Sequence, residues 1–178
     1  INDRNSKLDE KRSEYNSQKA RAQKELRNAQ LQLNQAQKEL EQSQLKLKQS
    51  QEQLSQAREY VDMLFNLKIG PEALEYLKQH PELIVQLTGK SLDEICSSLG
   101  ITDEEFFLLI SGDENVKFAL DSNFYQKQAE IDSGWARMNS GKAELAYSML
   151  EFHNKKIEVE TQLSDAQEQL DQAQKDID

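Results

Sequence analysis

Residues 22–57 read AQKELRNAQLQLNQAQKELEQSQLKLKQSQEQLSQA, and this stretch decides the fold. From Leu26 to Leu54 a leucine recurs at every seventh position, and an alanine or serine lies three residues after each leucine. A heptad with leucine at position a and a small residue at d is typical of a helix that packs against another helix. No glycine or proline occurs before Gly70, so we expect one helix from near the N-terminus to about Lys68.

The partner heptad lies at the other end of the chain. Large apolar residues occupy position d from Ile131 to Phe152 and position a at Leu163 and Leu170. The two heptads predict an all-α fold, in which an ascending arm at 1–57 and a descending arm at 121–178 form an antiparallel coiled-coil hairpin. The seam residues would be Leu26, Leu33, Leu40, Leu47, Leu54, Ile131, Met138, Leu145, Phe152, Leu163 and Leu170.

The expected register pairs residues whose numbers add up to 178, for example Leu47 with Ile131, although a shift by one heptad preserves the same pattern. This register also places Ile1 beside Ile177, so that both ends of the chain lie at one end of the hairpin. Such a geometry is typical of an insertion looped out between two neighbouring points of a larger protein, and we expect this of the present chain.

Residues 58–120 lose the heptad and are rich in aromatic residues, which predicts a small helical head between the arms. Glycines and prolines divide this head into short helices, expected at 72–79 and 82–87. Ser91 with Glu94, and Thr102 with Glu105, have the spacing of capping boxes, so two more helices should follow these pairs and end before Gly100 and before Gly112. A last helix should begin near residue 113 and merge with the descending arm, with a break at 121–123.

Composition excludes several classes of function. The formal net charge is -10, whereas nucleic-acid binding requires a basic face, so we expect no nucleic-acid partner. The longest apolar run is far shorter than the roughly 20 residues of a membrane-spanning helix, so we do not expect this part of the protein to be embedded in a membrane. One cysteine, Cys96, excludes an internal disulfide.

The sequence offers little for catalysis. His80 and His153 fall in different segments, and no general base is expected near Cys96, which we interpret as a core residue of a short amphipathic helix. There is no glycine-rich phosphate loop and no Cys/His spacing that suits zinc. We therefore expect no enzymatic activity, no cofactor and no metal.

Acidic residues dominate the head. Residues 58–120 contain five Lys or Arg and twelve Asp or Glu, a net charge of -7. The simplest interpretation is a solvated surface, and the functional one is a docking face for a cationic peptide or a basic protein. The centre of that face would be Asp103, Glu104, Glu105, Asp113 and Glu114. Residues 91–110 also resemble a helix-turn-helix, but the second helix begins with three acids, which excludes contact with DNA phosphates.

Two features of the arms allow more than one interpretation. Leu31 and Leu45 fall opposite the seam and are either exposed leucines or a contact to another helix. Gly134 and Gly141 lie seven residues apart in the descending arm. Because glycine inside a helix costs up to about 1 kcal/mol relative to alanine, the pair indicates a flexible point or a close approach of two helices, unless it is neutral drift.

The arms resemble the coiled-coil insertion of FtsX-like, MacB-type ABC transporter permeases of Gram-positive bacteria. The resemblance rests on KELEQSQLKLKQSQEQLSQA (38–57), EIDSGWARMNSGKAELA (130–146) and TQLSDAQEQLDQAQKDID (161–178). The second stretch is similar to the family phrase I-D-x-G-W-x-x-L-x-x-G-K-x-E-L. It matches at Ile131, Asp132, Gly134, Trp135, Gly141, Lys142, Glu144 and Leu145, with Met138 in place of leucine. The head matches no part of the family pattern.

This resemblance implies an extracellular domain between two membrane helices of a permease, with a cytoplasmic ATPase as its partner. In that family such a domain transmits ATP-driven motion to an external partner or substrate. Two alternatives remain open from the residues alone. One is an intracellular coiled-coil arm of a chromosome-maintenance-type ATPase, and the other is a passive coiled-coil spacer of another membrane protein.

Overall fold

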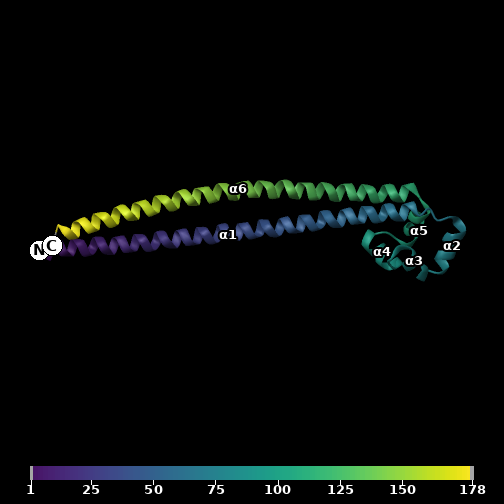
Figure 1. Ribbon diagram of the computed structural model, residues 1–178, viewed down its shortest axis with the longest axis horizontal. Helices are drawn as coiled ribbons and strands as arrows, with labels where there is room; N and C mark the ends of the chain where they lie inside the picture. The colour runs from purple at the N-terminus through teal and green to yellow at the C-terminus, as the bar shows by residue number, and fades with distance from the viewer. Residues whose placement is uncertain (1, 177–178) are drawn as a thin grey trace. The chain divides into compact units, whose positions relative to one another are not determined.

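The computed structural model describes residues 2–176 and, within them, contains helices and no strand. Two long helices, α1 (Asn2–Asn66) and α6 (Glu114–Lys175), pack against each other as an antiparallel hairpin (Figure 1). The short helices between them are α2 (Pro71–Gln79), α3 (Glu82–Thr88), α4 (Leu92–Leu99) and α5 (Asp103–Ser111). The predicted all-α fold and the helical hairpin are therefore confirmed.

The chain forms two compact units, which are described separately. The first unit comprises the chain up to Ser43 and from Arg137 onward, and the second comprises Gln44–Ala136. Both units contain a part of α1 and a part of α6. Residues 58–66 and 114–120, which we expected in the head, continue the two long helices.

In the first unit, the start of α1 lies beside the end of α6 (Figure 1). Leu8 of α1 and Leu170 of α6 are both buried, and the Arg12 guanidinium donates a 2.8 Å hydrogen bond to the Gln174 side chain. The other predicted seam residues of this unit are half-buried, except Met138, which is buried. The expected pairing of Ile1 with Ile177 lies outside the described residues.

The second unit has a core of its own. Helix α5 packs against α4 and α2, and it contributes Phe106, Leu109 and Ile110, whose side chains are inaccessible to solvent. The equally buried residues that complete this centre come from α1, α3 and α4 and are Val61, Leu64, Ile84 and Ile95. The seam residues Leu54 and Ile131 join the same apolar cluster, so the two long helices close the core of the short ones.

The ends of the short helices follow the sequence signals. Both predicted capping boxes form, Ser91 with Glu94 and Thr102 with Glu105. In each box the side chain of the first residue accepts the N–H of the glutamate, whose carboxylate accepts the N–H of the first residue. The expected break at 121–123 is wrong, because α6 is continuous from its first turn to Lys175. Asp121 there holds a lysine of the preceding turn instead of ending the helix.

The two glycines of α6 lie against leucines of α1. A Cβ atom added to Gly134 would stand 2.6 Å from Cδ2 of Leu47, and one added to Gly141 would stand 3.0 Å from Cδ2 of Leu40. Of the interpretations given above, the close approach of two helices is the one that this geometry supports. We expected Leu47 beside Ile131. Leu47 lies against Gly134, which is three residues further along α6 and on the same face of that helix as Ile131, as for a side chain that inserts into a hole on its partner.

The effect of replacing Gly134 by alanine on the free energy of unfolding should therefore depend on Leu47, and it should change sign when Leu47 is shortened. In the wild-type chain, G134A gains about 1 kcal/mol of helix propensity, but overpacking against Leu47 costs about 1–3 kcal/mol, so a net loss of stability is expected. In an L47A background the obstructing methyl group is gone, and the same change should stabilise by about 1 kcal/mol. Urea unfolding followed by circular dichroism gives both values.

G141A provides the graded comparison, because its Cβ would meet Leu40 at the milder distance of 3.0 Å. Its effect on the free energy of unfolding should lie between those of G134A in the two backgrounds. An equal stabilisation by G134A with and without L47A would contradict the close packing described here.

Candidate functional site

The five acidic residues expected to form a docking face do not share one role in the structure. Glu105 accepts hydrogen bonds from the N–H and the hydroxyl of Thr102, at 2.8 and 3.1 Å, and so completes the cap of α5. Asp113 accepts the backbone N–H groups of Asn115 and Val116, at 2.9 and 3.0 Å, and so caps α6. These two carboxylates satisfy helix N-termini, a local structural role that explains their presence without a partner.

Asp103 contacts the single thiol of the chain. Cys96 is buried in the second unit, and its side chain is hydrogen-bonded to Asp103. Burial, followed by this hydrogen bond and the negative charge of Asp103, raises the pKa of Cys96 to about 11. The thiol is therefore protonated at neutral pH, and a protonated, buried thiol is a poor nucleophile. This environment is that of a structural cysteine.

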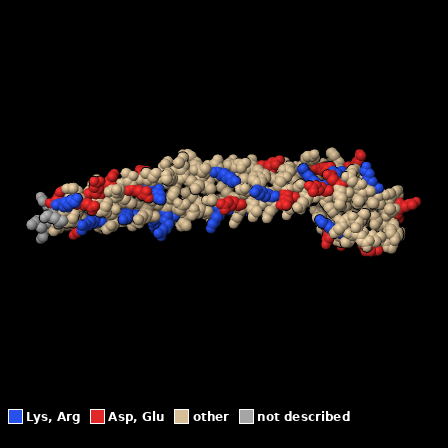
Figure 2. Space-filling model, viewed as in Figure 1, with Lys and Arg blue, Asp and Glu red and all other residues tan. Residues whose placement is uncertain are grey.

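Glu104 and Glu114 are the remaining members of the predicted face. Both are exposed in the first turns of their helices, where a negative charge interacts favourably with the helix dipole. Their carboxylates, unlike those of the other three predicted acids, neither cap a helix nor contact Cys96. In Figure 2 acidic side chains lie at the outer edges of the short helices, whose visible face is otherwise mostly uncharged. Any partner contact of the predicted face would depend mainly on this pair.

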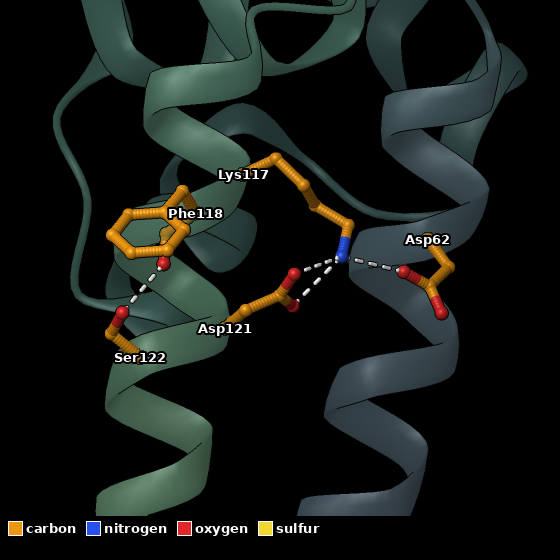
Figure 3. Close-up of polar contacts among 5 residues, drawn as sticks. All are labelled: Asp62, Lys117, Phe118, Asp121 and Ser122. Atoms are coloured by element: carbon orange, nitrogen blue, oxygen red, sulfur yellow. Dashed lines mark hydrogen bonds and ion pairs between the residues drawn. The ribbon is translucent and has the colours of Figure 1, made fainter.

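A lysine clasp, formed by Lys117 with Asp62 and Asp121, joins the two long helices in the second unit (Figure 3). The Lys117 ammonium lies 2.9 Å from Asp62 of α1 and 2.7 Å from both carboxylate oxygens of Asp121. Burial alone lowers the pKa of Lys117, but the hydrogen bonds to Asp121 and Asp62 outweigh it and raise the pKa above its ordinary value. Sequence analysis missed this clasp, because Asp62 and Lys117 are far apart in the chain.

Two aromatic residues of α6 lie on the surface of the second unit. Phe118 and Tyr125 are 73% and 71% exposed, the highest values among the exposed large apolar side chains of the described chain. Phe118 points away from the neighbouring Lys117 clasp (Figure 3). Tyr125 has the Arg58 guanidinium 5.4 Å from its ring centroid, close enough for a cation–π contact. The seven-residue spacing places both aromatics on one side of α6.

The two histidines belong to different units. His80 belongs to the second unit and interacts with its own neighbours, the ring of Tyr76 and the carboxylate of Glu82. His153 lies in the first unit. Among residues 2–176, no group of three or more His, Cys, Asp and Glu side chains is placed to hold a metal ion. None of the helices over the same residues is both long and apolar enough to span a membrane.

Loss of the lysine clasp should destabilise the second unit by a modest amount that depends on pH. K117M removes the cation that pairs with two partly exposed carboxylates, and we expect the free energy of unfolding to fall by about 1 kcal/mol near neutral pH. Because folding raises the pKa of Lys117, this stabilisation is complete below the ordinary value of 10.5 and disappears as the pH rises through the folded value. Denaturant unfolding of both proteins between neutral and strongly alkaline pH measures the difference.

The matched control for this experiment is K127M, which removes an exposed lysine of the same helix. K127M should change the free energy of unfolding little at any pH. If K117M and K127M behaved alike, the clasp would have no energetic role.

Comparison of the chain with models of known protein families, with curated proteins and with solved structures found no match.

Proposed function

We propose that this chain is the extracellular domain of an FtsX-like, MacB-type ABC transporter permease from a Gram-positive bacterium. In this role the hairpin passes ATP-driven motion to an external partner or substrate. The acidic helical part, which is the predicted head at residues 58–120, recognises that partner. The other partners would be the rest of the permease and its cytoplasmic ATPase. The proposal builds on the resemblance of the arms, including the phrase around Gly134 and Trp135.

The observation that carries the proposal is the position of the two outer helix ends. The start of α1 and the end of α6 lie side by side, joined by the hydrogen bond between Arg12 and Gln174. A domain inserted between two adjacent membrane helices needs its entry and exit at such neighbouring points. Both α1 and α6 are also unbroken helices, as expected of elements that pass on a displacement.

The decisive test asks on which side of the cell membrane this domain lies in the intact parent protein. We would introduce N115C at an exposed position and treat whole cells with a membrane-impermeant thiol reagent. Asn115 is preferable to Asp113, because the Asp113 carboxylate caps α6. Labelling of N115C in intact cells is the expected result. Labelling only after lysis would contradict the proposal and favour the intracellular arm of a chromosome-maintenance-type ATPase.

The parent with only its native Cys96 is the control for this test. Cys96 is 8% exposed and has a raised pKa, so it should stay unlabelled until the domain is unfolded. A C96A variant that carries N115C should give the same pattern as N115C alone. This comparison assigns the signal to the introduced thiol.

Reversal of the two available acids tests recognition by the acidic helical part. The double variant E104K/E114K should retain the helical content, at a cost of about 0.3–1 kcal/mol per site from the helix dipole, and should impair the function of the parent. E52K/E168K makes the same change of charge at two exposed positions elsewhere and should leave that function intact. Equal function of the two double variants, measured by complementation of a deletion strain, would exclude the docking face.

A further inference from the structure

An open groove runs along one side of the coiled coil in the first unit. It has a volume of about 730 Å³ and lies between residues 29–43 of α1 and residues 141–155 of α6. We call this feature the lateral groove. Its apolar lining includes the seam residues Leu33, Leu40, Leu145 and Phe152. All four remain half-buried, so the hairpin alone does not complete their burial.

The groove is open because the residues that usually cover a coiled-coil seam are small here. In two-stranded coiled coils, long side chains beside the seam shield the apolar residues. On α6, the covering positions are occupied by Gly141 and Ser148. On α1, the facing seam positions are Ala29, Ala36 and Ser43. A further helix could approach these residues closely.

The walls of the groove are acidic. Glu39 lines it from α1, and Glu144 and Glu151 line it from α6. One cation, Lys155, also lines the groove, and its ammonium lies 3.9 Å from Glu25. An occupant would therefore meet negative charge on both walls, and a basic occupant would be favoured.

We propose that the lateral groove binds an amphipathic helix of a partner protein, with apolar residues facing the seam and Lys or Arg on both flanks. The groove extends over about 14 residues of α1, or about 21 Å at 1.5 Å per residue, so the bound helix has about four turns. Glu144 and Glu151 are one heptad apart, so the bound helix carries a basic residue in successive heptads. The hairpin then becomes two strands of a three-helix coiled coil.

Charge favours this partner over a second copy of the chain. Two copies that meet groove to groove bring Glu39, Glu144 and Glu151 of one chain toward the same acids of the other. Like charges that meet at an interface oppose association. The proposal concerns the coiled coil and is independent of recognition by the acidic helical part.

A synthetic peptide serves as the probe. It contains three heptads, about 21 residues, with leucine at a and d and lysine at e and g, and it carries a fluorescent label. Fluorescence anisotropy with the full 178-residue chain should show saturable, salt-sensitive binding. A peptide with glutamate in place of lysine, and a scrambled peptide of the same composition, should each bind at least about tenfold more weakly. Equal binding of the lysine and scrambled peptides would reduce the effect to unspecific attraction and overturn the proposal.

Variants of the chain locate the binding. S148W fills the groove and should abolish binding, whereas L150W places the same side chain about 200° around α6, at a position that is already 57% exposed, and should not affect it. E144Q/E151Q should weaken binding about tenfold and reduce its salt dependence, with unchanged helicity. Because this pair of changes leaves the shape intact, it tests the proposal even if S148W distorts the hairpin.

Two further outcomes would overturn the proposal. One is binding of the lysine peptide that S148W and E144Q/E151Q leave unchanged. The other is self-association of the chain in sedimentation experiments that S148W removes and L150W does not, since the occupant would then be a second copy.

Discussion

The structure depends on the packing of the heptad leucines of α1 against α6. These leucines cannot be buried by their own helix, so α6 has to cover them. Leu40 and Leu47 lie against Gly141 and Gly134, where an added Cβ atom would stand 3.0 and 2.6 Å from the leucine Cδ2 atoms. This fit sets the distance between the helices and fixes which residues of α6 face α1. In the second unit the same pair of helices closes the core around Phe106, so the short helices depend on the packing of the long ones.

Local rules explain why so much of the fold could be predicted from the sequence. A leucine heptad, a capping box and a glycine after a helix each involve residues close in the chain, and helices α2 to α5 lie where these signals placed them. The predicted break at 121–123 failed because a tertiary contact outweighed local propensity. Asp121 holds Lys117, which also reaches Asp62 across the hairpin. No local pattern reveals a partner 55 residues away.

The candidate site was less predictable, because a count of acids does not show what each carboxylate does. Three of the five predicted residues are engaged within the fold, two as caps and Asp103 with Cys96. The capping role of Glu105 could be read from its spacing to Thr102, whereas the contact of Asp103 could not. The lateral groove has a signal in the sequence, namely small residues that recur at a seam position of α1 and at the position beside the seam in α6. Its interpretation requires knowledge of which sides of the helices face each other.

The apolar cluster around Phe106 lies entirely within the second unit, so a local opening of that unit would expose its core. Cys96, the single cysteine of the chain, lies in the second unit alone. Under native conditions, the rate at which the Cys96 thiol exchanges its proton with solvent or reacts with a small reagent therefore reports transient opening of that unit. The chain thus carries an intrinsic chemical reporter for the opening of its second unit.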